Sequence, residues 1–420
     1  MIRDVDRLAM LITLEMGKPL AESRDEVAFA AEYCDWCADE AVRIAGSAQQ
    51  SPDGASRIVV VRRPVGPCLL ITPWNFPLAV PARGVGAALA AGCSVVLRPS
   101  SLAPLSAMAL AGILQSEGLP AGVLNVVVSG ADGTTDVLLS DPRLRRLTFT
   151  GGAGVGRYLV ARSADQLLRV GVELGGQAPF IVFPDADVDA AVDGAVAAKV
   201  RNGGQACTAA NRFHVHRDLA DEFTDRLARR LGGLTVGRGT QPGVDLGPMI
   251  GEAQRRRLVE LVDDAVRRGA RTVLWGGALA GPGHFFAPVV LRDAPEEARI
   301  CREEIFGPVA SVSVFQCESE VVARANRCAQ GLGAYVYTRD LDRAFRVGEA
   351  IEVGMVAVNR GRISSVASPF GGAKHSGFGV AGGADPLADY LQTRSLTVDA
   401  TGAGREQHVR PPAAMLGCSA

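Results

Sequence analysis

The chain has 420 residues, of which 48% are hydrophobic and 21% charged, and its formal net charge at pH 7 is -1. A chain of this length is expected to bury a large core in two or three domains. The balanced charge, without a polybasic block, argues against nucleic acid or an anionic membrane as a partner. The apolar runs are too short to span a bilayer, and residues 1–20 mix charged with apolar positions, unlike a secretory signal. Nine cysteines at irregular spacings in so large a chain predict a reduced, cytoplasmic setting, and their spacing predicts no metal site.

The first 64 residues predict helices followed by a hairpin. Over 3–45 apolar positions recur three or four residues apart, with a break at 16–19. A Pro-Asp-Gly turn before the β-branched run "RIVVV" predicts a hairpin over 46–64. Cys34 and Cys37 have the spacing of a redox dithiol, but they fall within the helical stretch, which favours a structural role.

Strands and helices alternate through the rest of the chain. From 65 to 174 the expected strands are "CLLI", "CSVVLRP", "VLNVVV", "LRRLTFT" and "RVGVEL", with helices over 79–91, 104–117, 132–140 and 154–164. This βαβ alternation predicts a mostly parallel sheet covered on both faces. A second α/β region is expected over 175–389, with strands "PFIVF" and "FHVHR" and helices near 187–201 and 218–231. Residues 390–400 predict a final strand, and 401–420 predict a frayed, flexible tail.

The stretch "RNGGQACTAANR" (201–212) places Cys207 among glycines and small polar residues. Only about 3% of an ordinary thiol is thiolate at pH 7, so a catalytic Cys207 needs a base or an electropositive setting, and open space. The glycines can supply the space. Taken alone, a single cysteine of this kind is more often a small buried residue than a nucleophile.

Four other motifs offer chemistry, each with a structural alternative. Glu173 ends an apolar strand, where a partly desolvated carboxylate suits a general base; an ion-paired strand end is the alternative. Asn75, between the prolines of "ITPWNFP", can direct its amide N–H at an oxyanion or cap a rigid turn. Glu304 can bind ribose hydroxyls with Phe306 packed beside it, or lie in a solvated acidic turn. The Gly-rich loop at 148–156 lies between a strand and a helix, as nucleotide-binding loops do, but it lacks the G-x-G-x-x-G spacing.

Together these stretches resemble the aldehyde dehydrogenase superfamily from about residue 3 to 398, and most of all its succinate-semialdehyde dehydrogenase branch. The motifs that carry the resemblance, in family order, are "AALAAGCSVVLRPS", "GLPAGVLNVV", "ELGGQAPFIVFPDADVDAAV", "RNGGQACTAANR" and "SPFGGAKHSGFG". The resemblance implies an α/β fold with three parts and a homodimer or homotetramer. These parts are a Rossmann-type parallel-sheet coenzyme domain (1–45 and 65–174), an α/β catalytic domain (175–389) and a small β oligomerisation element (46–64 and 390–400).

The resemblance also implies oxidation of an aldehyde to a carboxylic acid with NAD(P). Cys207 would attack the carbonyl to give a thiohemiacetal and then a thioester, while Asn75 and the Cys207 backbone N–H hold the oxyanion. Glu173 would activate the water that releases the acid. The residues expected against the cofactor are Thr72, Pro73, Trp74, Gly151, Gly152, Val155, Leu174, Glu304 and Phe306.

Cofactor and substrate preference follow from further positions of the same resemblance. NAD-preferring relatives usually have Lys and Glu where "RPSS" places Arg98 and Ser101. The missing carboxylate relieves repulsion of a 2′-phosphate, which Arg98 can bind, so we predict NADP, with NAD as a weaker cofactor. Arg201, Ser364 and Arg83 match the positions that hold the distal carboxylate of succinic semialdehyde, which predicts an aldehyde of that kind.

The sequence departs from the resembled pattern in three places. The family has a longer segment before the position of Met1, which suggests a shortened coenzyme domain or a misassigned start. Gly152 replaces a Ser or similar residue, and Ala209 replaces a second cysteine, so no disulfide can form beside the nucleophile. Rival hypotheses are a dehydrogenase for another aldehyde, a CoA-acylating relative, and a truncated inactive paralogue that acts as a binding or assembly subunit. The retained Glu173 argues against the second and the intact Cys207 against the third.

Overall fold

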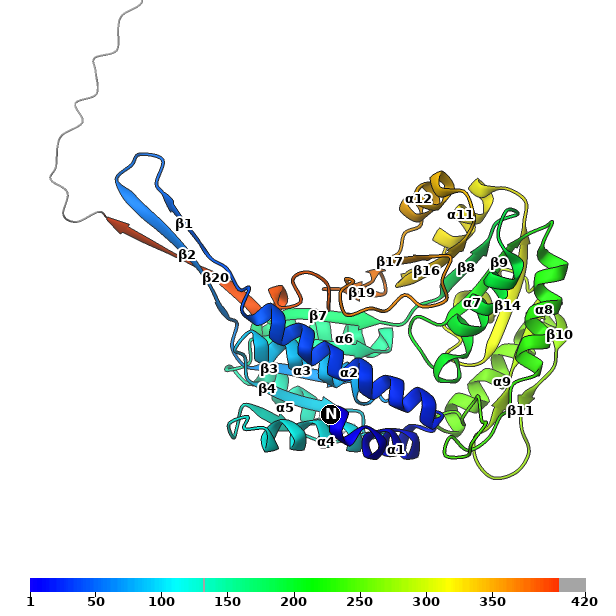
Figure 1. Cartoon of the computed structure of the whole chain (residues 1–420), viewed down its shortest axis with the longest axis horizontal. Helices are drawn as coiled ribbons and strands as arrows, with labels where there is room; N and C mark the ends of the chain where they lie inside the picture. Colours follow the sequence, from blue (N-terminus) through cyan, green and yellow to red (C-terminus); the bar gives the residue numbers. More distant parts are fainter. Residues whose placement is uncertain (131–132, 400–420) are drawn as a thin grey trace, which may run out of the picture.

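A computed structural model describes residues 1–130 and 133–399, so the flexible tail predicted at 401–420 lies outside the described residues. Two α/β units lie side by side, and a β arm projects from the first of them (Figure 1). None of the helices in the described ranges is both long and apolar enough to cross a membrane.

The first unit is built on a six-stranded sheet in the order β19-β7-β6-β3-β4-β5. Its strands are β3 (Cys68–Thr72), β4 (Val95–Pro99), β5 (Leu124–Val126), β6 (Arg146–Gly151), β7 (Arg169–Leu174) and β19 (Gly377–Phe378). All neighbours are parallel except β19 and β7. The central strand β3 is buried at every residue, as expected where helices cover both faces of a parallel sheet.

Helices connect these strands, and two long helices precede them. They are α1 (Val5–Met16), α2 (Leu20–Ala41), α3 (Ala79–Ala90), α4 (Leu105–Ser116), α5 (Thr134–Ser140) and α6 (Ala153–Ser163), with short 3-10 turns at Ile2–Asp4 and Ala164–Gln166. The predicted break is confirmed: α1 ends at Gly17, whose φ of 97° is left-handed, and α2 begins after Pro19. Cys34 and Cys37 lie on α2, and burial raises their pKa to about 11 and about 12, which disfavours a redox thiolate.

The second unit is a seven-stranded sheet in the order β10-β13-β14-β9-β8-β16-β17, parallel except for the edge strand β10. Its strands are β8 (Ala178–Val182), β9 (Ala210–His216), β10 (Arg271–Leu274), β13 (Val289–Arg292), β14 (Val309–Phe315), β16 (Gly333–Tyr337) and β17 (Met355–Val358). Its helices are α7 (Val188–Val200), α8 (Ala220–Gly232), α9 (Glu252–Arg267), α10 (Arg299–Arg302), α11 (Glu318–Asn326) and α12 (Leu341–Ala350). Phe180 is fully buried at the centre of its core, where it stacks on Tyr337 with ring centroids 4.9 Å apart.

Short ladders and turns complete this unit. They are β11 (Gly277–Ala278) with β12 (Phe286–Ala287), β15 (Gln330–Gly331) with β18 (Ala373–Lys374), and a 3-10 turn at Arg201–Gly204. A further 3-10 turn, Ala388–Tyr390, packs on the core of the first unit.

The predicted hairpin and final strand form the projecting arm. β2 (Ser56–Pro64) lies between β1 (Ser47–Gln50) and β20 (Leu391–Asp399), and both pairings are antiparallel. Every β1 residue is exposed, as is every β20 residue after Leu391. The arm therefore has little core of its own and stands clear of both sheets (Figure 1).

One segment of the expected catalytic region, 175–389, joins the first sheet instead. Gly377 pairs with Glu173 in the antiparallel ladder of β19 and β7, and the Leu174 N–H donates to the Ser376 carbonyl at 2.9 Å. β7 would otherwise be a sheet edge with unpaired backbone groups, and β19 satisfies them. The chain therefore leaves the first sheet after Leu174 and returns to it at Gly377.

Candidate active site

A cavity of 340 Å³ lies where the carboxyl ends of β3, β6 and β7 face the chain that leads into β9. Ligands of open parallel sheets bind at this edge. The cavity brings most of the predicted site residues together from segments far apart in the sequence. These are Pro73, Trp74, Asn75, Arg83, Gly151, Gly152, Glu173, Leu174, Arg201, Cys207, Glu304, Phe306 and Ser364.

A tight left-handed turn aims Cys207 into the cavity. Asn202, Gly203 and Gly204 have φ values of 58°, 62° and 74° in succession. Glycine adopts this conformation freely, and a Cβ at Gly204 would also overlap the carbonyl oxygen of Gly307. The glycines beside Cys207 are therefore required by the backbone, and they leave the thiol half-buried at the cavity wall.

The thiol is protonated in the resting protein. Burial raises the pKa of Cys207 to about 12, and the charges of Glu173 and Glu304 add to the effect, whereas Arg83 and Arg201 oppose it. The Cys207 backbone N–H makes no backbone hydrogen bond within the described residues, so it is available to a ligand. Nucleophilic attack by Cys207 therefore requires that its proton be removed as the carbonyl carbon approaches.

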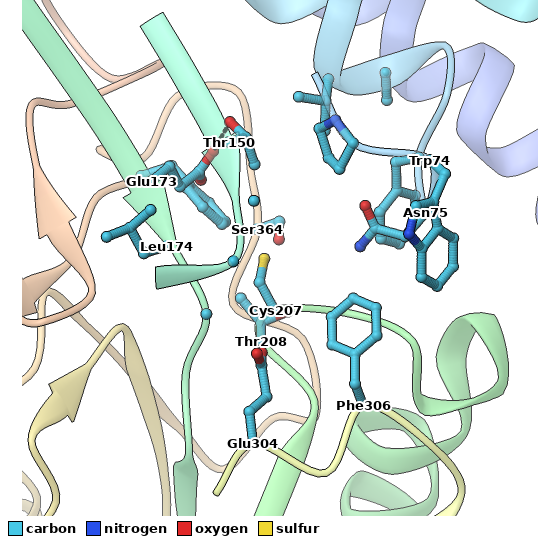
Figure 2. Close-up of a pocket in the computed structure, with 18 of the residues that line it drawn as sticks. Trp74, Asn75, Thr150, Glu173, Leu174, Cys207, Thr208, Glu304, Phe306 and Ser364 are labelled. Carbon is cyan, nitrogen blue, oxygen red and sulfur yellow. Dashed lines mark hydrogen bonds between the residues drawn. The ribbon is translucent and has the colours of Figure 1, made fainter. Parts of the chain in front are cut away.

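Asn75 is held from several sides. Its side-chain Nδ2 donates to the backbone carbonyl of Gln205 at 3.0 Å. The backbone carbonyl of Asn75 accepts from Lys18 Nζ and Asn202 Nδ2, each at 2.9 Å. Lys18 also pairs with the buried Glu26 at 2.5 Å. A side-chain amide has two N–H donors, so one remains after the bond to Gln205. Figure 2 shows the Asn75 amide and the Cys207 thiol pointing into the same space.

Glu173 has features of both predictions made for it, the ion-paired strand end and the partly desolvated carboxylate. Its Oε2 accepts from Thr150 Oγ1 at 2.9 Å and pairs with the guanidinium of Arg83, whereas its buried Oε1 has no partner in the described structure. The side chain is 14% exposed. Ion pairing therefore fixes one oxygen and leaves the other able to accept a proton from water.

Arg83 lines the main cavity, and its guanidinium pairs there with Glu173. It also lies 4.9 Å from the centroid of the Phe370 ring. A guanidinium that is 12% exposed needs a nearby counter-charge, and Glu173 is that counter-charge. Arg83 thus belongs to the surroundings of the carboxylate at position 173.

Two aromatic rings and a half-buried acid also line the cavity. Trp74 and Phe306 meet edge to face with ring centroids 5.5 Å apart. Glu304 Oε1 accepts the Gly176 N–H at 3.1 Å, and burial raises the Glu304 pKa to about 7. A Cβ at Gly175 would overlap the Glu304 carboxylate, and one at Gly176 would lie 2.8 Å from the Cys207 carbonyl oxygen. Both glycines are therefore required by close packing.

The surroundings of Gly152 and Arg98 are compatible with a bound dinucleotide. Gly152 begins α6 without a side-chain cap, and a Cβ placed there would meet nothing within 4 Å, so the helix N-terminus is open to a phosphate. Arg98 donates to Ser129 Oγ at 3.0 Å and to the Gly130 carbonyl at 2.8 Å, but it pairs with no carboxylate in the described chain. Its positive charge therefore remains available to an additional phosphate.

Four predicted cofactor residues lie outside the main cavity. Arg98 lies near the carboxyl end of β4, Ser101 follows that strand, and Val155 is exposed on the first turn of α6. Thr72 instead lines a rear cavity of 60 Å³, because it is the buried last residue of β3. Glu173 borders both cavities. No cluster of metal-ligating side chains occurs within the described ranges.

Arg201 and Ser364 also line the main cavity. The Arg201 guanidinium lies 4.7 Å from the centroid of Phe76, and neither Arg201 nor Ser364 makes a side-chain hydrogen bond or ion pair with the described protein. Arg362 lines an adjoining cavity with Arg201. Sequence reasoning missed Arg362, although it stands two residues before Ser364, and it also missed Lys18, which was interpreted only as part of a helix break.

Comparisons with known proteins identify the family of the chain. The sequence model of the aldehyde dehydrogenase family matches residues 1–396. The chain is 50% identical to a succinate-semialdehyde dehydrogenase of Paenarthrobacter nicotinovorans, covering 93% of this chain and 87% of the relative. It is 45% identical to the NADP(+) succinate-semialdehyde dehydrogenase GabD of Escherichia coli (strain K12), covering 95% and 83%. The crystal structure of a Burkholderia pseudomallei succinate-semialdehyde dehydrogenase is 46% identical, superposes with a TM-score of 0.93 and is covered to 83%, against 95% of this chain. This chain therefore belongs to the aldehyde dehydrogenase family.

Proposed function

We propose that this enzyme uses NADP to oxidise an aldehyde that carries a distal carboxylate, and that succinic semialdehyde is such a substrate. The observation that carries the proposal is the unpaired Arg201 with Ser364 at one end of the cavity that holds Cys207. A guanidinium is the natural partner of a carboxylate. The names of the relatives from Paenarthrobacter nicotinovorans and Escherichia coli, both succinate-semialdehyde dehydrogenases, support it.

The first bond forms between Cys207 Sγ and the aldehyde carbon. The thiol proton passes to water as the bond forms, and the carbonyl oxygen becomes an oxyanion. The free N–H of the Asn75 amide and the backbone N–H of Cys207 donate to that oxygen. Each such donor contributes about 3–4 kcal/mol to the stability of the transition state.

Oxidation follows on the same carbon, and the nicotinamide supplies the hydride acceptor when it is bound. The product of this step is a thioester on Cys207. Glu173 then takes a proton from water through its unpaired Oε1, while Arg83 and Thr150 hold Oε2. Hydrolysis releases the carboxylic acid and returns the thiol.

We assign the preference for NADP to Arg98, whose charge has no carboxylate partner in the described part of the chain. Replacing Arg98 by Ala should lower kcat/KM about tenfold or more with NADP and little with NAD. A wild-type enzyme with a higher kcat/KM for NAD than for NADP would refute this part of the proposal.

The decisive experiment measures reduced nicotinamide formed from succinic semialdehyde and NADP, with butanal as a neutral aldehyde of the same carbon number. The proposal predicts a much higher kcat/KM for the semialdehyde, and Arg201→Gln should remove most of that preference. Equal efficiency for both aldehydes in the wild type would overturn it. No oxidation of any aldehyde in a panel, with either cofactor, would instead favour the inactive paralogue.

A homodimer or homotetramer and a cytoplasmic location are also part of the proposal. The strongly exposed arm of β1, β2 and β20 supports oligomerisation, because it has little core of its own. Eight cysteines of the described chain are free, which supports a reducing compartment. Light scattering of the purified protein tests the oligomer directly.

A further inference from the structure

A second cavity of 50 Å³ adjoins the main cavity beyond Arg201. The residues that line it are Glu22, Asp25, Glu26, Phe29, Phe76, Arg201 and Arg362. Arg201, Phe29 and Phe76 line both cavities, so they form the boundary between the two. A ligand that extends past Arg201 therefore enters a space whose far side carries Arg362.

Arg362 and Arg201 are two cations without partners. Neither makes a hydrogen bond or an ion pair with another described residue, although each guanidinium lies over an aromatic ring, Arg362 at 5.3 Å from the centroid of Phe29. Partial desolvation and the nearby positive charge of Arg201 lower the pKa of Arg362, whereas the charges of Asp25 and Glu32 oppose this shift. Two like charges placed together in this way are an unfavourable arrangement that a bound anion would relieve.

The acidic residues of the outer cavity do not fill that role. Glu26 is already engaged by Lys18 and by the backbone N–H groups of Leu78 and Ala79 at the start of α3. Glu22 accepts the backbone N–H of Asn202 at 2.7 Å. Asp25 is exposed and makes no ion pair within the described chain. The two guanidinium groups thus remain available to a ligand.

We propose that Arg362, together with Arg201, forms an outer carboxylate site for ω-carboxy aldehydes whose chains are longer than that of succinic semialdehyde. The inference rests on the proposed function and extends it, because the aldehyde still has to reach Cys207. The rings of Phe29 and Phe76 contact the additional methylene groups at the boundary of the two cavities. Arg201 alone binds the acid group of the four-carbon substrate, and both arginines bind that of a five- or six-carbon substrate.

The test compares Arg362→Gln with wild type on succinic, glutaric and adipic semialdehydes, and on pentanal as a neutral aldehyde. Loss of one charged hydrogen-bonding partner should raise KM about tenfold for the two longer acids and leave kcat nearly unchanged. Succinic semialdehyde should lose less than about threefold in kcat/KM, and pentanal should not change. Arg362 is exposed, so the variant is expected to fold; its thermal unfolding is measured to confirm this.

Arg360→Gln is the matched control. Arg360 is exposed in the same loop as Arg362, and it lines neither the main nor the outer cavity. Its substitution removes the same charge. Its effect on the longer acids should stay below about twofold, as for a general change in surface potential. Equal losses in the two variants would refute the outer site, as would an Arg362→Gln enzyme that matches wild type on glutaric semialdehyde.

Arg201→Gln separates the failure of this inference from the failure of the proposed function. If Arg201→Gln impairs all three acids and Arg362→Gln impairs none, only the outer site is wrong. If wild type oxidises pentanal as efficiently as the acids and Arg201→Gln has no effect, the proposed function is wrong as well. Product inhibition gives a readout independent of turnover, since glutarate should inhibit wild type about tenfold more strongly than Arg362→Gln.

Discussion

The two ends of the main cavity are built in opposite ways. At the inner end, Asn75 and Glu173 are each tied to neighbours, and a chain of contacts runs from Asn75 through Lys18 to Glu26. At the outer end, Arg201 and Arg362 have no partner in the described chain. The protein thus holds the groups proposed for catalysis in position before a ligand binds, whereas the guanidinium groups proposed to select the ligand are free to pair with its carboxylate.

The largest expected effect comes from the reacting atom itself. Cys207→Ala should lower kcat by at least about 10⁴-fold, because no other thiol of residues 1–130 and 133–399 lines the cavity. Steady-state kinetics measures the loss, and titration should show cofactor binding unchanged. Cys317→Ala, which changes an exposed cysteine, should retain full activity. A Cys207→Ala enzyme with more than about one hundredth of wild-type activity would remove the proposed nucleophile.

The tied inner end is tested most directly at Lys18. Lys18→Met leaves the buried Glu26 without its cationic partner and should lower the free energy of unfolding by about 3–5 kcal/mol. Activity should fall too, since the Asn75 carbonyl loses its bond to Lys18. Denaturant unfolding measures the first effect. The control is Arg24→Met, which breaks an exposed ion pair on α2, the helix that also carries Glu26. If Arg24→Met lowered the free energy of unfolding by more than about 0.5 kcal/mol, the loss in Lys18→Met could not be assigned to burial of its ion pair.

Asn75→Ala tests the oxyanion donor. The variant should lose about 10²–10³-fold in kcat, equivalent to about 2.7–4 kcal/mol, with a smaller change in KM. The kcat and KM are compared at saturating cofactor. A purely structural Asn75 would instead lower stability and raise KM while leaving kcat within a few fold, and this result would count against its role at the oxyanion.

A smaller effect concerns Glu304 and pH. Its pKa is raised by burial from 4.5 to about 7, so between these values the native protein keeps a proton that the unfolded chain has lost. Raising the pH through this window therefore lowers the free energy of unfolding, by at most on the order of 3 kcal/mol. Glu304→Gln should remove this decline, and its advantage over wild type should be larger at pH 8 than at pH 5. Parallel pH profiles of stability would contradict it.

The smallest effect distinguishes the outer end by salt. The unpaired Arg201 and Arg362 attract a carboxylate across water, so raising ionic strength from about 0.05 to 0.5 M should raise KM for glutaric semialdehyde about two- to threefold. The kcat should not move, because the inner groups are buried and already paired. Pentanal serves as the neutral control, and an equal response of its KM would show that salt acts on the whole enzyme.

Much of the fold follows from patterns within short segments. The alternation of apolar strands and helices predicts both sheets, and the Pro-Asp-Gly turn predicts the hairpin that became β1 and β2. The return of β19 to the first sheet could not be predicted, because two residues carry no periodicity. Only the pairing needs of β7, just over two hundred residues earlier in the sequence, explain it.

The site shows the same division between local and distant information. Motif chemistry identified Cys207, Glu173 and Asn75, which the cavity brings together. It did not predict the ion pair of Arg83 with Glu173, because that partner lies 90 residues away along the chain. Arg362 was not predicted for a related reason, since an arginine in a loop is usually a surface charge. Only the three-dimensional structure shows that it lines the same cavity as Arg201.

The close glycine contacts at Gly175, Gly176 and Gly204 have a consequence for motion. They press the turn after β7, the Cys207 loop and the 304–307 loop together with no room for a side chain between them. We therefore expect a movement between the two sheets to change the separation of Glu173 and Cys207 little, because close packing holds the segments that carry them together. Ligands would then enter past the walls that Phe76, Arg362 and Ser364 line.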